Sequence, residues 1–497
     1  MREPAGGGSG LTLPAPQEAR RLRQSFVDAN YTEQGLLRLF GVVETPMPHL
    51  RNLPRLLDLT REPTLLNTLV RWFLLGLPAA RDRARGLFAE ELLRTFVESG
   101  LLRADGEALT PTALLVPVGP YLVASDLYQK LLSPQDFEHV LTINPPARLL
   151  MDFTVRRPSR ATLDLCSGSG VQALAAAAHS DTVVATDLNP RATRFAEFSA
   201  RLNDCEKLRC LTGDAFAPAE GDTFDLIVCN PPFILAPAKR YLYRDSGMEL
   251  DGFCRSLVRG APPHLNDGGY FQMILEWVEV KGQPWHERMA AWFEGIGCDV
   301  WLLKNYSHDP SWYAHTRLRE TPFRSTEADA ATYAEWMDYY RRHGVEAIHG
   351  GLVAMRRRGG SAWMRIEELP DRVEERLGES VLQKFESCDF LESHPSDESL
   401  LRTRLRLAPD LRRDEESSWS DGHWTTPFVR LRKAHGLPQS TGLTADVMGF
   451  LSRFDGIQTV GQVIEETAVR AGVDAAQARA ECMRVVRLMI DRSFLLA

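Results

Sequence analysis

Ala161-Thr162-Leu163-Asp164-Leu165-Cys166-Ser167-Gly168-Ser169-Gly170 is the stretch that decides the fold of this chain. It begins as a short apolar run, interrupted only by Asp164, and ends in two closely spaced glycines. Residues 171–178 follow directly and are rich in alanine, the best helix former. A strand, a glycine turn and a helix in this order are typical of a nucleotide-binding site. Glycine lets the backbone approach a ligand, and the helix N-terminus offers unpaired N–H groups.

Three further apolar runs end in a polar side chain: residues 183–186 before Asp187, residues 208–212 before Gly213-Asp214, and residues 224–229 before Asn230. Helical stretches separate these runs, and strands that alternate with helices indicate a parallel sheet with helices on both faces. Ligands collect at the carboxyl ends of such strands, and an acidic residue about 20 positions after the glycines suits ribose hydroxyls. The sequence therefore predicts an α/β fold with one ligand site at the strand ends.

The glycine pattern alone also fits the dinucleotide site of an NAD-dependent oxidoreductase, which remains an alternative of a different class. Asp164 argues against it. This residue lies in the strand just before the turn, where a carboxylate repels a pyrophosphate and attracts an ammonium group. The ligand is therefore expected to carry a cation where NAD carries phosphates, as S-adenosylmethionine does.

Asn230-Pro231-Pro232-Phe233 is the second informative motif. Two consecutive prolines fix φ and remove two backbone donors, which leaves the Pro231 carbonyl as a rigid acceptor beside the Asn230 side chain. These two acceptors suit an NH2 group, and Phe233 offers a flat face on which a planar substrate can stack.

Together these motifs resemble those of the class I S-adenosylmethionine-dependent methyltransferases, in the branch with an Asn/Asp-Pro-Pro-aromatic motif (methyltransferase small type). The resemblance covers residues 145–358 and implies a Rossmann-like, seven-stranded, mostly parallel sheet with S-adenosylmethionine as the cofactor. Members of this branch methylate the glutamine amide of release factors (the HemK-like family), adenine N6 or guanine N2.

The resemblance also implies roles for single residues. Asp164 is expected to hold the methionyl amine, Asp187 the ribose hydroxyls, and Asp214 with Ala215 the adenine. Cys166-Ser167 stands where many relatives have one glycine or Gly-Thr, and this difference is expected to reshape the rim of the pocket. The expected cofactor-binding residues are Asp164, Cys166, Gly168, Gly170, Asp187, Leu188, Asp214, Ala215 and Asn230, and the expected catalytic residues are Asn230, Pro231, Pro232 and Phe233.

The substrate expected first is a protein glutamine side chain, in a release-factor-like partner, because the motifs resemble the HemK-like family and because the chain is acidic. A nucleobase of RNA or DNA follows, and a scaffold that binds the cofactor without transferring methyl groups is a further alternative. The net charge of −8 provides no global basic field for nucleic acid. The loop 236–251 mixes basic and aromatic residues directly after the second motif, so it is expected to grip or gate the substrate.

With 497 residues, 44% of them hydrophobic, the chain is expected to form several domains of a globular protein. Eight scattered cysteines are not a disulfide framework, and their spacing completes no zinc site, so a reducing cytoplasm and no metal are expected. Neither a signal peptide nor a membrane span is expected, and the sequence does not indicate the oligomeric state.

The expected domains are a disordered tail (1–16), an N-terminal helical, winged-helix-like domain (17–144), the methyltransferase domain (145–358), a linker and irregular region (359–444) and a small C-terminal helical, winged-helix-like module (445–497). Residues 145–160 are expected to include a helix over the cofactor. Residues 305–350 are expected to form an insertion with an aromatic-rich helix on the substrate side.

Overall fold

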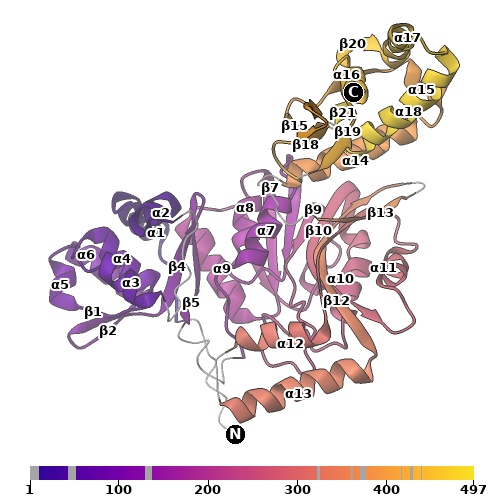
Figure 1. Ribbon diagram of the computed structural model, residues 1–497. Helices are drawn as coiled ribbons and strands as arrows, with labels where there is room; N and C mark the ends of the chain where they lie inside the picture. The colour runs from indigo at the N-terminus through magenta and orange to yellow at the C-terminus, as the bar shows by residue number, and fades with distance from the viewer. Residues whose placement is uncertain are drawn as a thin grey trace. The chain divides into compact units, whose positions relative to one another are not determined.

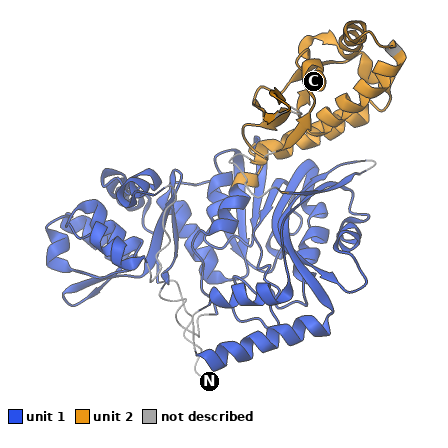
Figure 2. Ribbon diagram, in the orientation of Figure 1, with its two compact units in different colours: residues 1–151, 157–368 blue, residues 152–156, 369–497 orange. Residues whose placement is uncertain are grey.

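The computed structural model of the chain describes residues 10–42, 52–128, 137–321, 325–359, 362–369, 377–415, 417–425, 429–437 and 439–497. Internal contacts divide the chain into two compact units, residues 1–151 with 157–368 and residues 152–156 with 369–497 (Figure 2). The predicted disordered tail lies largely outside the described residues, although the helix α1 (Pro16–Asp28) begins at its last position.

An eight-stranded sheet in the order β13-β11-β12-β10-β9-β6-β7-β8 forms the centre of the first unit (Figure 1). Its strands are β6 (Ser159–Leu165), β7 (Ser180–Asp187), β8 (Leu208–Thr212), β9 (Phe224–Cys229), β10 (Leu265–Val280), β11 (Cys298–His308), β12 (Val345–Arg357) and β13 (Met364–Glu368). The five strands β6 to β10 are parallel, and β12 runs antiparallel between β10 and β11. The predicted mostly parallel sheet is therefore confirmed.

The predicted number of seven strands is wrong by one, because β13 adds an edge strand parallel to β11. The sequence interpretation ended the domain at residue 358. The side chains of β13 are half-buried or exposed, so this strand lacks the continuous apolar run by which the buried strands were recognised.

Helices cover both faces of the sheet, with α8 (Val171–Ala176) and α9 (Pro190–Leu202) on one side and α10 (Gly252–Gly260) and α11 (Trp285–Phe293) on the other (Figure 1). Buried apolar residues of α10 and α11, including Leu257 and Trp292, share one core with Leu163, Ile227 and other strand residues. This alternation of helices with the parallel strands β6 to β10 places the carboxyl ends of these strands at one edge of the sheet.

Two helices lie between β11 and β12, as the predicted insertion requires: α12 (Pro310–Arg319) and α13 (Thr326–Arg342). Asp309 and Ser325 cap their N-termini with side-chain oxygens. Trp336, Tyr340 and Tyr313 bury their rings in a small core with Ile234 and Leu235, which directly follow the Asn-Pro-Pro-Phe motif. The aromatic helix therefore packs against the segment that leaves the predicted catalytic turn.

The N-terminal part of this unit contains α1, α2 (Glu33–Phe40), α3 (Leu53–Leu59), α4 (Leu65–Phe73), β1 (Ala79–Ala80), α5 (Arg81–Arg85), α6 (Glu90–Glu98), β2 (Leu102–Asp105), β3 (Ala108–Pro111), β4 (Ala113–Val118) and β5 (Tyr121–Asp126). The predicted hairpin around Asp105-Gly106 is confirmed as β2–β3. Phe26, Phe73 and Phe96 form the aromatic core of this N-terminal part. The same core includes Phe195 and Phe198 of α9. The winged-helix character of this part stays a prediction.

The second unit contains α14 (Leu377–Ser393), α15 (Asp397–Leu401), β14 (Arg404–Leu407), β15 (Leu411–Glu415), β16 (Ser418–Ser420), β17 (His423–Thr425), β18 (Val429–Lys433), β19 (Ser440–Leu443), α16 (Ala445–Leu451), β20 (Asp455–Thr459), α17 (Val460–Ala471), α18 (Ala475–Asp491) and β21 (Leu495–Leu496). Instead of the expected linker, the described part of 359–444 thus holds helices and strands. Leu405 and Val429 share a core with Val463 and Met489 of the C-terminal helices, because neither segment can bury its apolar side chains alone. Among the described residues, no helix is long and apolar enough to cross a membrane.

Candidate functional site

A cavity of about 1010 Å³ opens at the carboxyl ends of the parallel strands. It is lined by residues that directly follow β6, β7, β8 and β9, and by residues 139–147, which lead into α7 (Pro145–Phe153). The helix expected in residues 145–160 is therefore present and borders the cavity. Every residue predicted for the site lines this cavity except Gly170.

Asp164 is a buried carboxylate on β6, with 1% of its surface exposed. Its Oδ2 accepts a hydrogen bond of 2.9 Å from the Ala173 N–H, whereas its buried Oδ1 has no partner among the described residues. Burial raises the pKa of Asp164 to about 8, against the Ala173 hydrogen bond, which lowers it, and nearby Asp187 adds to the rise. A buried carboxylate with one vacant acceptor suits an ammonium group, which satisfies the oxygen and balances the charge.

The turn after Asp164 requires unusual backbone angles. Gly168 and Gly170 have φ of 54° and 80°, and Cys166 between the strand and the glycines has φ of 59°. A Cβ on Gly168 would meet nothing within 4 Å, whereas one on Gly170 would lie 2.8 Å from the Ala196 Cβ of α9. Gly168 thus borders open space for a ligand, and Gly170 is needed for close packing of α8 against α9 rather than for lining the cavity.

Asp187 ends β7, and its carboxylate is oriented by two backbone donors. Its Oδ2 accepts from the Gly168 N–H and its Oδ1 from the Asn189 N–H, each at 2.8 Å. Burial raises the pKa of Asp187, while these two hydrogen bonds lower it. Each oxygen keeps a further lone pair, so the carboxylate can accept from ribose hydroxyls in the cavity.

The next three predicted positions, Leu188, Asp214 and Ala215, form the outer wall of the cavity. Leu188 is 48% exposed beside Asp187, an apolar surface on which a planar ring can lie. Asp214 is exposed after β8, and Ala215 has φ of 44°, a conformation that turns the chain sharply toward β9. The Gly213 N–H donates to the Asp187 carbonyl at 2.9 Å, which fixes this turn against β7.

Asn230, Pro231, Pro232 and Phe233 leave β9 along the same cavity. The half-buried Asn230 side chain has no hydrogen-bond partner among the described residues, so its amide is available to a ligand. Phe233 is half-buried and contacts both the sheet core and the aromatic core of α13. One cavity therefore joins the unpartnered oxygen of Asp164 to the acceptors of the second motif.

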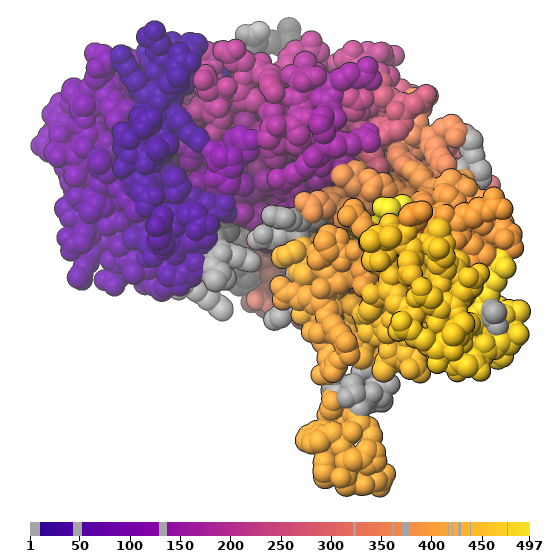
Figure 3. Space-filling view, turned by 90° about the horizontal axis from the view of Figure 1, so that it is seen from above, coloured from indigo at the N-terminus to yellow at the C-terminus, as the bar shows by residue number. Residues whose placement is uncertain are grey.

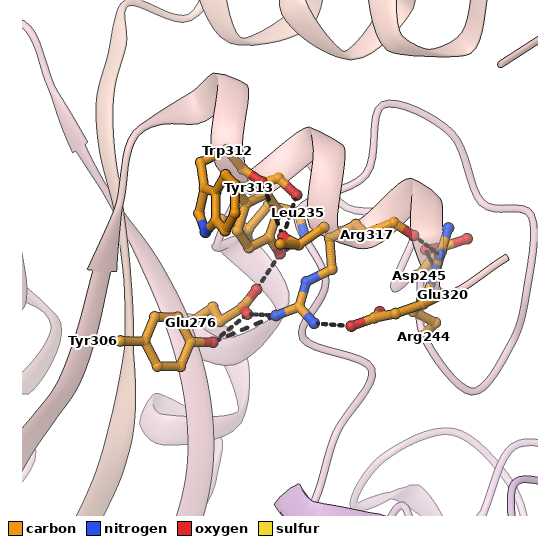
Figure 4. A network of polar contacts seen from close by, with 10 residues as sticks. Leu235, Arg244, Asp245, Glu276, Tyr306, Trp312, Tyr313, Arg317 and Glu320 are labelled. Atoms are coloured by element: carbon orange, nitrogen blue, oxygen red, sulfur yellow. Dashed lines mark hydrogen bonds and ion pairs between the residues drawn. The ribbon is translucent and has the colours of Figure 1, made fainter. Parts of the chain in front are cut away.

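A network of polar side chains lies next to these residues, and the sequence did not predict it (Figure 4). Glu276 of β10 is fully buried, and its carboxylate accepts from the Tyr306 hydroxyl at 2.5 Å, from the Tyr313 hydroxyl and from the Arg317 guanidinium. Arg317 also donates to Glu320 at 2.8 Å. Tyr306, Arg317 and Glu320 line the cavity.

The backbone explains how this network assembles. Gly350 of β12 pairs with both Glu276 and Tyr306, one on each neighbouring strand. A Cβ on Gly350 would lie 2.1 Å from the Tyr306 ring, so only glycine lets this ring cross β12 to reach Glu276. Burial and the neighbouring carboxylate raise the pKa of Tyr306 well above its usual value, which keeps its hydroxyl a donor. The one feature of the sequence that could have indicated this network is the carboxylate of Glu276 within an otherwise apolar stretch of β10.

The loop expected to grip the substrate contributes Lys239, Tyr243 and Arg244 to the cavity. Arg244 is nearly buried and pairs with Asp245 at 2.9 Å, and Arg240 instead pairs with Glu335 of α13 at 2.6 Å. Among the described residues, no group of three His, Cys, Asp or Glu side chains could hold a metal ion.

Comparisons with known proteins agree with this geometry. Residues 141–296 match the family model described as methyltransferase small domain. Over 146 residues the chain is 33% identical to a ribosomal protein uL3 glutamine methyltransferase of Bradyrhizobium diazoefficiens, covering 27% of this chain and 46% of that protein. Over 154 residues it is 33% identical to a release factor glutamine methyltransferase of Cereibacter sphaeroides, covering 28% and 54%. The chain thus spans about half the length of the curated relatives it matches.

Among solved structures, a similar one is an S-adenosylmethionine-dependent methyltransferase from Thiobacillus denitrificans in complex with S-adenosyl-L-homocysteine, at 16% identity and a TM-score of 0.27, covering 47% of this chain and all of that one. The sequence matches support the resemblance to the glutamine-methylating branch, whereas the roles of the single site residues stay predictions. The part of the sheet domain at residues 141–296 is therefore similar to the methyltransferase small domain, which supports S-adenosylmethionine as the cofactor of this cavity.

Proposed function

We propose that this protein is an N-methyltransferase that transfers the methyl group of S-adenosylmethionine to the side-chain amide of a glutamine in a substrate protein. The observation that carries the proposal is the single cavity shared by Asp164 and the Asn230-Pro231 acceptors. A cation-binding carboxylate and an NH2-binding pair on one cavity allow cofactor and acceptor nitrogen to be held next to each other.

In the cofactor half of the cavity, S-adenosylmethionine would be held by side chains that are already oriented by hydrogen bonds. The unpartnered Oδ1 of Asp164 would accept from the amino group of the cofactor, and Asp187 would accept from its ribose hydroxyls. Bound there, S-adenosylmethionine supplies a methyl group activated by a positively charged sulfur.

The acceptor half would work by orientation. An amide nitrogen is a poor nucleophile because its lone pair is delocalised. The Asn230 side-chain oxygen and the Pro231 carbonyl would accept from its two N–H groups and direct the lone pair toward the methyl group. The same two acceptors favour the positive charge that develops on nitrogen during transfer, and one N–H proton is then lost to water.

The charges around the acceptor half favour a protein substrate over a polynucleotide. Of the basic residues Lys239, Arg244 and Arg317 that line the cavity, only Lys239 has no carboxylate partner among the described residues, and three of the four acidic lining residues, Asp164, Asp187 and Asp214, belong to the cofactor half. Asp245 neutralises Arg244, and Glu276 with Glu320 neutralises Arg317. Phosphate binding depends on available cations, so this wall suits an uncharged amide better than a nucleotide flanked by phosphates. The similarity to a ribosomal protein uL3 glutamine methyltransferase and to a release factor glutamine methyltransferase supports the same choice.

Transfer of radiolabelled methyl groups from S-adenosylmethionine into cell extract tests the proposal. The label is expected in a fraction that protease destroys and nuclease leaves intact, and acid hydrolysis should release it as methylamine. Label that only nuclease removes would favour the nucleobase alternative. Cofactor binding without any transfer would favour the non-catalytic scaffold. Binding of NADH in preference to S-adenosylhomocysteine would favour the alternative of an NAD-dependent oxidoreductase.

A further inference from the structure

Two cysteines from neighbouring strands of the sheet meet beside the cavity. Leu165 at the end of β6 is the register partner of Cys229 at the end of β9, so Cys166 lies diagonally opposite Cys229. Neighbouring strands are about 4.8 Å apart and successive residues about 3.3 Å, which places the two Cα atoms of the cysteines about 6 Å apart. A disulfide spans Cα separations of about 4.4–6.8 Å, so this pair can be bridged.

The two thiols are already in contact. Both are free, and the Cys166 and Cys229 side chains are within hydrogen-bonding distance of each other. Both also pack in the core that the strands share with α10 and α11, so their side chains lie on the same face of the sheet. Cys254 of α10 belongs to this core too and is the competing thiol. The structure therefore brings a reactive pair together without any rearrangement of the fold.

The two cysteines differ in their access to the cavity. Cys166 is half-buried and lines the cavity, whereas Cys229 is fully buried beneath it. Burial raises the pKa of the Cys229 thiol, and the neighbouring Cys166 thiol adds to the rise. A buried thiol that stays protonated is unreactive toward a small oxidant. An oxidant that enters the cavity therefore reacts with Cys166 first.

Cys166 also has a backbone conformation that a cysteine adopts only at a cost. Its φ of 59° lies in the left-handed region, where a Cβ crowds the backbone and glycine is favoured. Such strain persists only where the surrounding structure fixes the residue. Disulfides at strained or accessible positions are the easily reduced ones. A bond formed at Cys166 is therefore expected to be reversible.

We propose that Cys166 and Cys229 form a peroxide-sensitive thiol pair, whose oxidation to a disulfide weakens cofactor binding and lowers methyl transfer. Hydrogen peroxide oxidises the Cys166 thiol to a sulfenic acid and is itself reduced to water. The Cys229 sulfur then attacks the sulfenic sulfur. The S–S bond forms, the S–O bond breaks, and the hydroxyl group leaves with the Cys229 proton as a second water.

The disulfide would join the two segments on which the site depends. Gly168, whose N–H donates to Asp187, lies two residues after Cys166, and Asn230 directly follows Cys229. A disulfide holds its sulfurs about 2.0 Å apart, closer than two thiols in contact, so both segments must shift. A displacement of about 1 Å can lower the rate of a positioned reaction a hundredfold. The loss of methyl transfer rests on the proposed function, whereas the disulfide and the loss of cofactor affinity do not.

Mass spectrometry of the full-length protein tests the proposal after treatment with hydrogen peroxide, alkylation with iodoacetamide and proteolysis. The peptides that contain Cys166 and Cys229 are expected to be linked and to separate on reduction with dithiothreitol. In calorimetry, the oxidised protein should bind S-adenosylhomocysteine about tenfold more weakly or worse, and reduction should restore the affinity. S-adenosylhomocysteine bound beforehand should slow the oxidation, because it covers Cys166 in the cavity.

Cys229→Ser removes the second thiol, so peroxide should leave Cys166 as a sulfenic acid that dimedone labels, whereas the wild type should take up little label. Cys229→Ala gives the same test if the serine variant does not fold, as its melting temperature shows. Cys482→Ser is the matched control, because this half-buried cysteine lies on α18 of the second unit, which Figure 3 shows in yellow at the surface. The control should oxidise like the wild type.

The proposal is overturned if Cys166 and Cys229 stay unlinked, if Cys166 links to Cys254 instead, or if the control prevents the link. It is also overturned if the oxidised protein binds S-adenosylhomocysteine as well as the reduced one. A disulfide that reversibly weakens this binding supports the proposal even where no substrate protein is methylated. The outcome is therefore distinguishable from a failure of the proposed function.

Discussion

Replacing Asp164 with Asn tests the ionic recognition of the cofactor with little change in shape. The asparagine oxygen can still accept from the Ala173 N–H, whereas its NH2 group replaces the vacant Oδ1. An ammonium ligand then faces a donor instead of an acceptor. A hydrogen bond to a charged group contributes about 1.5–3 kcal/mol, so the variant should bind S-adenosylhomocysteine about 10- to 150-fold more weakly where wild-type Asp164 is ionised.

The pH dependence of this loss follows from the position of Asp164. Its pKa is raised to about 8 by burial, so most of the ligand-free protein holds this carboxyl protonated at pH 7. Binding of an ammonium group requires the carboxylate, and ionising it one pH unit below its pKa costs about 1.4 kcal/mol. The affinity of the wild type relative to the variant should therefore rise about tenfold per pH unit up to about pH 8 and then level off.

Calorimetry in buffers of different ionisation enthalpy measures both the affinity for S-adenosylhomocysteine and the number of protons released on binding. The wild type should release about one proton on binding at pH 6.5, and the variant should release none from this position. The ligand-free variant should also be the more stable of the two near pH 8. A raised carboxyl pKa makes wild-type stability fall as pH rises from about 4 to about 8. Equal affinity of the two proteins at pH 8.5, or a ratio that does not change with pH, would refute this reasoning.

Three further changes are informative. Replacing Asp187 with Ala should weaken S-adenosylhomocysteine binding by about one to two orders of magnitude, because the hydrogen bonds to the ribose are lost; unchanged affinity in calorimetry would remove Asp187 from the site. Replacing Asn230 with Ala should leave this affinity nearly intact and lower methyl transfer about a hundredfold or more, so full turnover would contradict its role. Gly350→Ala should displace Tyr306 from Glu276 and lower the free energy of unfolding by about 1–3 kcal/mol, whereas the control Gly86→Ala meets only ordinary contacts; equal melting temperatures would show that Gly350 is not needed.

The ligand edge of the sheet could be predicted because its signals are local. Asp164, Asp187 and Asn230 each follow or interrupt a short apolar run, and parallel strands bring such positions to one edge. The glycine pattern could not separate the two roles that the structure shows. Gly168 borders the cavity, and Gly170 packs against Ala196, a residue of α9.

The substrate side could not be predicted, because its residues meet only in three dimensions. Glu276, Tyr306 and Arg317 come from β10, β11 and α12, and a single glycine on β12 lets the tyrosine cross between the strands. The strands within residues 404–443, which were expected to be a linker, were missed for a related reason. These short strands alternate arginines with buried leucine and valine, as in Val429–Lys433, and the dense charge obscured the apolar face.

A crystal structure of the protein with S-adenosylhomocysteine tests the central claim most directly. The account predicts the amino group of the ligand within hydrogen-bonding distance of Asp164 Oδ1, its ribose hydroxyls at the Asp187 carboxylate, and its sulfur facing Asn230 across open cavity. A ligand bound elsewhere, or one whose amino group turns away from Asp164, would contradict it.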